Sequence, residues 1–371
     1  MKLIKSVELY NPKYYGKKDI LIGGGRIVDI ASKISLSSRN LDIIDCNGLI
    51  VIPGLIDNHI HIAGAGGEGG PRTRTHQLDK EDLLEAGITT VIGCLGTDGF
   101  TRNVQDVLMK CKSLRENGFS SWIYTGSYQF PPPSITGDIR KDICYIDEVI
   151  GVGEIAIADH RSSSPGIDEF VKFLKEVRLA GMLSNKAGLL NVHVGNEGDA
   201  FHFLEKVIKI ANLGSSNLLP THCNRSEEVF KRVLNYGKEN IIDVTSSIKR
   251  NSESLSASKA VLRLLRNGVP IDNITISSDS CGSLPVFDKN GKLKKISTAK
   301  PITLFRELCN LMKEPEISKE TALKTVTRNP ANILQLNRKG EIEIDKDADM
   351  VVVDKDYNIR YNIVLGRIYK K

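Results

Sequence analysis

The sequence predicts an α/β protein, a (β/α)8 barrel of the TIM type with a small β-sandwich domain formed by both chain ends. Between residues 51 and 334, short apolar runs alternate with segments of helical period, as in parallel βα units. Eight such runs follow one another, which is the strand count of a TIM barrel. Residues 1–50 and 335–371 instead hold short strand-like runs without helical period, so we expect them to form one small β domain.

The small domain takes its strands from both ends of the chain. Asn, Pro, Gly and Lys turns separate the apolar runs of residues 1–50, and a strand pattern returns after Gly340. The predicted strands are Leu3–Leu9, Ile20–Ile22, Arg26–Ile30, Leu41–Cys46, Ile342–Ile344, Met350–Val353 and Ile363–Tyr369.

The predicted barrel strands are Leu55–His61, Thr89–Leu95, Trp122–Tyr128, Val149–Ile157, Leu189–Val194, Leu218–Cys223, Ile241–Ser246 and Ile274–Asp279. Segments with the apolar spacing of outer helices are Val104–Asn117, Asp168–Ala180, Phe201–Ala211, Glu227–Tyr236, Ser256–Arg266, Thr303–Met312 and Lys319–Thr327. We expect Pro330 to end the last of these helices, because a proline disfavours helical backbone in the residue before it.

Composition narrows the function classes. The chain has 371 residues, of which 40% are hydrophobic and 26% charged, so it can bury a large core. Its net charge of +6 is spread along the sequence without a basic stripe, which argues against nucleic acid as a partner. No run of about eighteen apolar residues occurs, so we expect no membrane span. The seven cysteines are scattered and never spaced as CxxC, which favours the reducing cytoplasm over a disulfide framework.

A His-x-His pair ends the first predicted barrel strand. Alternate residues of a strand project to one face, so His59 and His61 can reach a single metal ion. A glycine-rich loop follows and brings Glu68, Arg72 and Arg74 near the same place. The pair alone is equally well explained by two hydrogen-bonded polar residues at a strand end, so further ligands are needed.

Other metal-binding side chains also lie in the predicted barrel strands or at their carboxyl ends, where the active site of a parallel barrel lies. They are Glu154, His193, His222 and Asp279 in the fourth, fifth, sixth and eighth strands. Four of the seven histidines thus fall at strand ends. The other three, His76, His160 and His202, are expected to be exposed or locally hydrogen-bonded.

The chain resembles the metal-dependent amidohydrolase superfamily and, within it, the isoaspartyl (β-aspartyl) dipeptidases. The superfamily resemblance spans nearly the whole chain, through PGLIDNHIH, the strand-end histidines, SSDS and the tail GEIEIDKDADMVVVD. The narrower resemblance lies in longer motifs: GAGGEGGPRTRT, GTDGFTRN, TGSYQFPPPSITGDIRKD, ADHRSS and THCNRSE. These motifs favour the dipeptidases over dihydroorotase-like, hydantoinase-like and sugar-deacetylase relatives.

The resemblance implies a binuclear centre with two divalent ions per chain, zinc being the expected metal. In the implied set, His59, His61 and Asp279 hold the buried ion, His193 and His222 hold the exposed ion, and a carboxylate bridges them. A hydroxide shared by the ions attacks the amide carbonyl in this scheme. Asp279 is the implied proton shuttle and Tyr128 the implied hydrogen-bond donor to the oxyanion.

Charge predicts how such a pocket would bind its substrate. A β-aspartyl dipeptide has one ammonium and two carboxylates near the scissile bond, so its pocket needs an anion and fixed cations. Glu68 is the candidate for the ammonium, and Arg161 and Arg225 are the candidates for the carboxylates. Thr97 and Ser283 are candidates for further hydroxyl contacts. The expected partners are a small dipeptide substrate and further copies of the chain in a homo-oligomer, with no nucleic acid and no membrane.

Glu154 departs from the dipeptidase pattern, in which a carboxylated lysine bridges the metals seven residues before the arginine of the DHR motif. Counting back from Arg161 leads to Glu154 without a gap. We expect its carboxylate to bridge both ions directly, although it is about 3–4 Å shorter than a carbamate. Alternatively, Glu154 is a salt-bridged strand residue beside a mononuclear centre. Two other functions stay open: an amidohydrolase acting on N-acyl amino acids or cyclic amides, and a catalytically silent scaffold.

Overall fold

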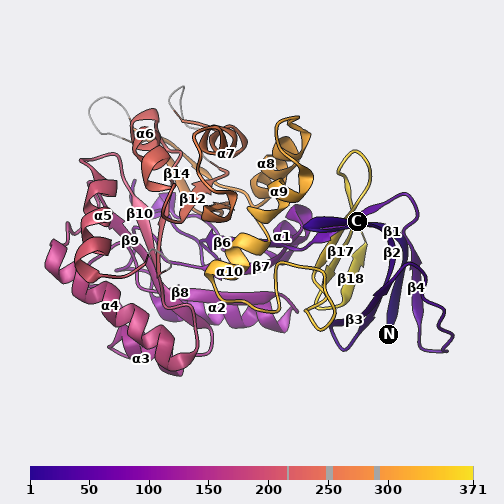
Figure 1. Ribbon diagram of the computed structural model, residues 1–371. Coiled ribbons are helices and arrows are strands. Elements are labelled where there is room, and N and C mark those ends of the chain that lie inside the picture. Colours follow the sequence, from indigo (N-terminus) through magenta and orange to yellow (C-terminus); the bar gives the residue numbers. More distant parts are fainter. Residues whose placement is uncertain (215–216, 248–253, 288–292, 371) are drawn as a thin grey trace.

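A computed structural model describes residues 1–214, 217–247, 254–287 and 293–370. Within these residues, eight parallel strands form a closed barrel (Figure 1). They are β6 (Leu55–Ile60), β7 (Ile88–Gly93), β8 (Ser120–Thr125), β9 (Val149–Ile157), β10 (Leu189–Val194), β11 (Leu218–Thr221), β12 (Ile242–Thr245) and β13 (Ile274–Ser277). Strands β6 to β11 form one hydrogen-bonded sheet, β12 pairs with β13, and these two lie against β11 and β6. The predicted TIM-like barrel is therefore present.

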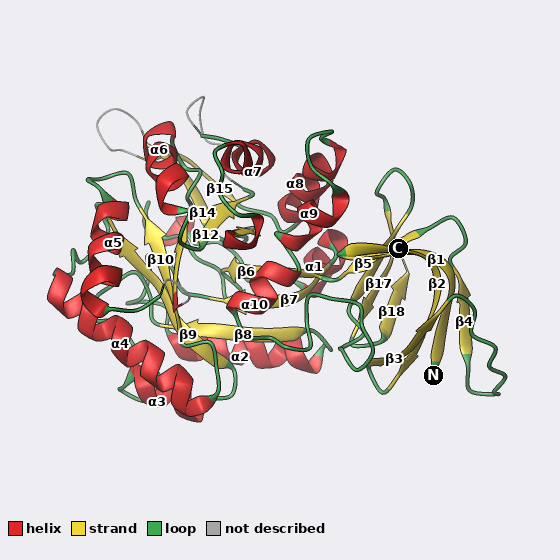
Figure 2. Ribbon diagram, in the orientation of Figure 1, coloured by secondary structure: helices red, strands yellow, loops and turns green. Residues whose placement is uncertain are grey.

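Helices surround the barrel strands (Figure 2). They are α1 (Lys80–Ala86), α2 (Val104–Glu116), α3 (Ile139–Tyr145), α4 (Ile167–Ser184), α5 (Ala200–Ala211), α6 (Glu227–Tyr236), α7 (Ala257–Arg266), α8 (Ile302–Lys313), α9 (Lys319–Lys324) and α10 (Arg328–Ile333). Helix α5 illustrates why these segments are helical. The Asp199 side chain caps its N-terminus by accepting a hydrogen bond from the His202 backbone N–H, and Phe201, Leu204 and Val207 face the core. The expected stop at Pro330 is wrong, because Pro330 lies in the first turn of α10, where a missing N–H is tolerated.

Both chain ends contribute to one eight-stranded sheet beside the barrel, and Figure 1 shows the two termini there. Its strands are β1 (Lys2–Asn11), β2 (Lys13–Gly23), β3 (Arg26–Ala31), β4 (Asp42–Asp45), β5 (Ile50–Pro53), β16 (Met350–Val353), β17 (Ile359–Val364) and β18 (Arg367–Lys370). Strand β5 joins the two ends, since it pairs with β1 on one side and β16 on the other. Seven strands follow one hydrogen-bonded path, from β18 through β17, β16, β5, β1 and β2 to β3, and β4 pairs with β1 beside it. The division into two facing sheets stays a prediction.

Several strands differ from the prediction. Residues 342–344 form no strand: Ile342 is buried, but its backbone N–H donates to the Asn11 side chain instead of a sheet partner. The single strand predicted over residues 363–369 is a hairpin of β17 and β18, whose turn at Leu365 and Gly366 has positive φ angles. After β13, the strands β14 (Ser283–Phe287) and β15 (Leu293–Thr298) form an unpredicted hairpin, and residues 288–292 between them lie outside the described chain.

Buried hydrogen bonds fix the carboxyl ends of the last strands. The Asp243 carboxylate accepts from the hydroxyls of Thr221 at 2.8 Å and Thr275 at 2.7 Å, which joins β11, β12 and β13 inside the barrel. Asp57 of β6 accepts from the backbone and the hydroxyl of Ser278. Burial raises the pKa of Asp57 to about 7, although the bonds from Ser278 oppose this shift. These bonds position the residues that follow β11 and β13.

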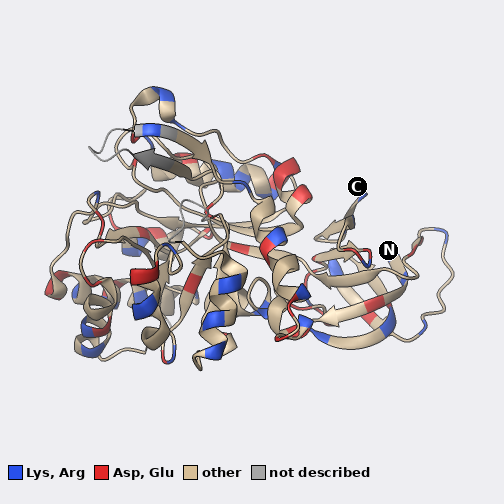
Figure 3. Ribbon diagram, turned by 90° about the horizontal axis from the view of Figure 1, so that it is seen from above, with Lys and Arg blue, Asp and Glu red and all other residues tan. Residues whose placement is uncertain are grey.

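Basic and acidic residues are both distributed along the chain, over the barrel and the small β domain alike (Figure 3). Among the described residues, no helix combines the length and apolar character needed to cross a bilayer.

Candidate metal centre and substrate pocket

The metal-ligand candidates from five strands meet inside the barrel, at the carboxyl ends of the strands. Each side chain is almost completely buried. His59 lies in β6, Glu154 in β9 and His193 in β10. His61 and His222 directly follow β6 and β11, and Asp279 is the second residue after β13. The structure thus brings together all six predicted ligands.

Glu154 lies at the centre of the four histidines. Its Oε2 is 3.1 Å from His193 Nδ1 and 3.5 Å from the Nε2 atoms of both His59 and His222. Its Oε1 is 3.4 Å from His61 Nε2, yet this buried oxygen has no hydrogen-bond partner among the described residues. A buried carboxylate oxygen without a hydrogen bond is costly in an apoprotein. The site therefore fits divalent ions, which would occupy the space between the imidazoles and the carboxylate.

Asp279 completes the cluster from the opposite side of the barrel. Its Oδ1 is 3.1 Å from His61 Nε2 and 3.7 Å from His59 Nε2. Its backbone N–H donates to the His59 carbonyl at 3.0 Å, which holds β13 against β6. Burial favours the neutral acid, but the contact with His61 and the neighbouring His222 hold the pKa of Asp279 at about 2. Asp279 is therefore a carboxylate at neutral pH.

Outer hydrogen bonds orient the imidazoles. His59 Nδ1 lies 3.0 Å from Asn191 Oδ1, and His222 Nδ1 lies 2.9 Å from Thr245 Oγ1. These contacts leave the Nε2 atom of each ring facing the cluster, as in metal sites where a second residue fixes the histidine tautomer. Burial and the nearby His193 lower the pKa of His222 to about 3, so its ring is neutral and able to bind a cation.

Cys94 is a member of this cluster that the sequence analysis did not select. It directly follows β7, and its Sγ lies 3.8 Å from both His59 Nε2 and His61 Nδ1. The available signal was the same strand-end position that identifies the histidines. The cysteines had been considered only for disulfides and CxxC motifs.

Tyr128 lies at the rim of the cluster. Its hydroxyl is 2.7 Å from His193 Nδ1. Burial, reinforced by the Glu154 carboxylate, raises the pKa of the Tyr128 phenol well above its ordinary value. The phenol is therefore protonated at neutral pH and can donate a hydrogen bond to an oxygen in the pocket.

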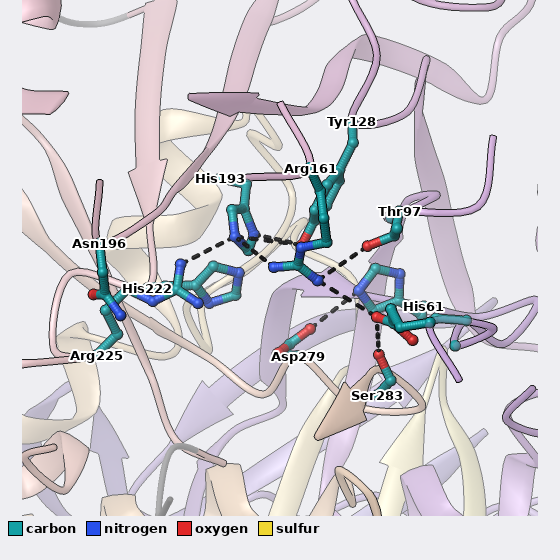
Figure 4. Close-up of a pocket in the computed structure, with 14 residues that line it drawn as sticks. His61, Thr97, Tyr128, Arg161, His193, Asn196, His222, Arg225, Asp279 and Ser283 are labelled. Atoms are coloured by element: carbon teal, nitrogen blue, oxygen red, sulfur yellow. Dashed lines mark hydrogen bonds and ion pairs between the residues drawn. The ribbon is translucent and has the colours of Figure 1, made fainter. Parts of the chain in front are cut away.

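The predicted substrate-binding residues line the pocket above the cluster (Figure 4). Glu68 Oε1 accepts from the Ser283 hydroxyl at 2.6 Å and lies 3.4 Å from Arg161 Nη1. The second oxygen, Oε2, is buried and has no hydrogen-bond partner among the described residues. Arg161 Nη1 also donates to Thr97 Oγ1 at 3.1 Å. One anion and its neighbouring cation thus face the same cavity.

Arg225 enters the pocket from the other side. Its Nη1 lies 3.0 Å from His193 Nε2 and donates to the Val194 carbonyl. Arg225 and Arg161 therefore approach the cluster from the segments that follow β11 and β9.

Asp159, missed by the sequence analysis, holds Arg161 in place. It accepts from Arg161 Nε at 2.8 Å and Nη2 at 2.9 Å, and lies 3.1 Å from His193 Nε2. Burial opposes its ionisation, but the bonds from Arg161 and His193 hold the pKa of Asp159 far below its ordinary value. Its place in the DHR motif was the available signal.

The three histidines outside the cluster, His76, His160 and His202, are exposed, as expected.

Comparisons with known proteins agree with this geometry. A model of the amidohydrolase family matches residues 50–369. The crystal structure of a beta-aspartyl dipeptidase from Fervidobacterium islandicum AW-1, in complex with a beta-Asp-Leu dipeptide, superposes with a TM-score of 0.94 at 38% identity. The match covers 100% of this chain and 96% of that chain.

Curated sequence relatives are more distant or match only in part. A dihydroorotase of Staphylococcus epidermidis is 34% identical over 116 residues, which span 31% of this chain and only 26% of that relative's length. A dihydroorotase of Carboxydothermus hydrogenoformans is 26% identical over 93% of this chain and 86% of its own length.

Proposed function

The chain belongs to the amidohydrolase family, and we propose that it is a metal-dependent dipeptidase that hydrolyses the isopeptide bond of β-aspartyl dipeptides. The observation that supports this most is the pairing of buried Glu68 with Arg161 beside the metal-ligand cluster. The similar Fervidobacterium enzyme was crystallised with a dipeptide of this class.

Charge complementarity supports this substrate. The Oε2 of Glu68, which has no hydrogen-bond partner among the described residues, would accept a hydrogen bond from the α-ammonium of the substrate. The guanidinium groups of Arg161 and Arg225 would bind its two carboxylates, and the hydroxyls of Thr97 and Ser283 would add contacts at the same wall. Arg161 lies 3.4 Å from Glu68, so the α-ammonium and the α-carboxylate of the aspartyl group, which share one carbon atom, would bind within one small region.

We propose that two divalent ions, most simply zinc, bind in the cluster. His59, His61 and Asp279 would hold one, His193 and His222 the other, and Glu154, which contacts all four histidines, would lie between them. Imidazole nitrogen and carboxylate oxygen are ligands suited to zinc. Such ions supply Lewis acidity and make a bound water more acidic.

The side chains of the chain provide the remaining chemistry. The ionised Asp279 would accept the proton of the attacking water and then pass it to the leaving amine. The protonated Tyr128 would donate a hydrogen bond to the carbonyl oxygen as negative charge develops on it. Arg161, held by Asp159, would keep the substrate in position during both steps.

A substrate panel tests the proposal against the family alternatives. Zinc-loaded protein is assayed with β-Asp-Leu, with dihydroorotate and with N-acetyl-leucine, and Asp279→Asn is the inactive control. Hydrolysis of β-Asp-Leu as the best substrate is expected. Faster turnover of dihydroorotate or N-acetyl-leucine would instead establish the alternative activity, and no turnover by fully metallated protein would favour a silent scaffold.

A cytoplasmic location, self-assembly and domain boundaries near residues 50 and 334 stay predictions.

A further inference from the structure

We propose that Cys94 is an additional metal ligand, and that its thiolate binds the same ion as His59. This inference rests on the proposed function in one respect: it requires a metal in the cluster. It adds a sulfur ligand to a set for which the sequence indicated only nitrogen and oxygen.

The position of Cys94 is fixed by the barrel. Its backbone N–H donates to the Ile60 carbonyl at 3.1 Å, which holds the end of β7 beside the end of β6. The side chain is fully buried. Cys94 therefore lies against the strand end that provides both His59 and His61, on a rigid part of the backbone.

The distances match those between ligands of one ion. A tetrahedral zinc with sulfur at about 2.3 Å and nitrogen at about 2.0 Å keeps these two atoms about 3.5 Å apart. Cys94 Sγ lies 3.8 Å from His59 Nε2, and Glu154 Oε2 lies 3.5 Å from the same nitrogen. Three different ligand atoms thus surround one space. His59, His61, Cys94 and Glu154 form a single group of candidate ligands with all four atoms within 4.8 Å of one another.

A second, independent observation indicates that a cation belongs beside Cys94. Glu154 belongs to the same ligand group as Cys94, and its Oε1 is buried and has no hydrogen-bond partner among the described residues. Gly96, two residues after Cys94, leaves this region open: a Cβ there would lie 2.9 Å from the His61 ring and 3.3 Å from Glu154 Oε1. The segment from Cys94 to Gly96 can therefore approach the cluster closely.

The thiolate would also offset the short reach of Glu154. Glutamate ends about 3–4 Å closer to its backbone than a carboxylated lysine does. A third anionic ligand, at the end of β7, would share the charge of the ions with Glu154 and Asp279. Because thiolate is a soft ligand, it favours zinc or cobalt over magnesium and manganese at this position.

Spectroscopy of the cobalt-substituted protein tests the proposal without relying on activity. The purified protein is stripped of metal and loaded with Co²⁺, and its absorption is compared for the parent, Cys94→Ser and Cys111→Ser. Cys111 is the matched control because it is also fully buried but belongs to no group of candidate ligands among the described residues. Metal analysis and thermal unfolding accompany each spectrum, and Cys94→Ala is measured as a second variant in case Cys94→Ser does not fold.

We expect a sulfur-to-cobalt charge-transfer band in the parent and in Cys111→Ser, and its loss in both Cys94 variants. X-ray absorption of the zinc form should show a sulfur neighbour at about 2.3 Å in the parent and in Cys111→Ser, and in neither Cys94 variant. Zinc affinity should fall at least tenfold in Cys94→Ser. Bound Co²⁺ with no sulfur band in the parent would overturn the assignment of Cys94 while leaving the metal centre intact. A parent protein that binds neither Co²⁺ nor zinc would refute the metal centre itself, and with it the proposed function.

Discussion

Replacing Glu68 by Gln tests the recognition of the substrate ammonium. Glutamine is nearly isosteric with glutamate but neutral. The Glu68 side chain is only 6% exposed, and its Oε1 is already held by Ser283 and Arg161, so Oε2 is the oxygen that a substrate ammonium would contact. The substitution therefore removes one negative charge at the place where the positive charge is expected.

The size of the effect follows from the burial and the neighbours of Glu68. Two opposite charges about 4 Å apart interact by about 4 kcal/mol at an effective dielectric constant of about 20. Arg161, 3.4 Å from Glu68, offsets part of this interaction, and the glutamine oxygen keeps one hydrogen bond. We therefore take half of the value, about 2 kcal/mol, which corresponds to about a 30-fold fall in kcat/KM.

The assay measures kcat/KM for β-Asp-Leu and for succinyl-leucine, which is the same molecule without the α-amino group. Glu68→Gln should lose about 30-fold with β-Asp-Leu and change little with succinyl-leucine. Glu85→Gln, an equal charge change at an exposed position on α1, is the matched control. Zinc content should be unchanged in both variants. A loss of less than about threefold, or an equal loss with both substrates, would refute the role of Glu68.

Four further predictions concern other parts of the molecule. The activity of the metal-reconstituted protein should not depend on bicarbonate, because Glu154 replaces the carbamate. A large increase in activity on adding bicarbonate, or full activity in Glu154→Ala, would contradict the role of Glu154. Arg225→Met should lower kcat/KM for β-Asp-Leu at least tenfold while zinc content and thermal stability stay within error, since its charge faces the pocket. His193→Ala should lose about one of two bound ions by metal analysis, and retention of both would exclude this ligand. Hydrogen bonds from Arg140 lower the pKa of Asp138, the N-cap of α3, to about 2. The ionised side chain therefore stabilises the fold above its ordinary pKa of 3.8, and this stabilisation is lost as the pH falls towards 2. The difference in the free energy of urea unfolding between the parent and Asp138→Asn should shrink as the pH falls, and a difference independent of pH would contradict this prediction.

Periodicity predicted the repeated units of the barrel well. Strands β9 and β10 and helix α6 have the predicted bounds, because their apolar residues are continuous or regularly spaced. Polar or glycine residues flank these elements except at Ala158, which follows β9. The hairpin of β14 and β15 was missed, since its lysine-rich second strand, Leu293–Thr298, has little of the apolar alternation that identifies strands. The segment 342–344 has the apolar alternation of a strand, but only Ile342 is buried, while Ile344 is exposed.

The candidate site was predictable where strand order places side chains together. The histidines and Asp279 could be found because parallel strands end at one rim of the barrel. Cys94 and Asp159 also carried a signal, the strand-end position and the DHR motif, but neither signal shows which residues they contact. Their roles depend on distances between strand ends: 3.8 Å from Cys94 Sγ to His59 Nε2 and 3.1 Å from Asp159 Oδ2 to His193 Nε2. No sequence spacing encodes these distances.

The measurement that tests the central claim most directly is the ratio of kcat/KM for β-Asp-Leu to that for α-Asp-Leu with zinc-loaded protein. The two dipeptides have the same composition and charge but differ in which carboxyl group forms the amide. A pocket that fixes the ammonium at Glu68 and a carboxylate at Arg161 should leave buried charges unpaired when the α-linked isomer binds. We therefore predict a ratio of at least about 100, or about 3 kcal/mol. Equal rates, or faster hydrolysis of α-Asp-Leu, would contradict the account.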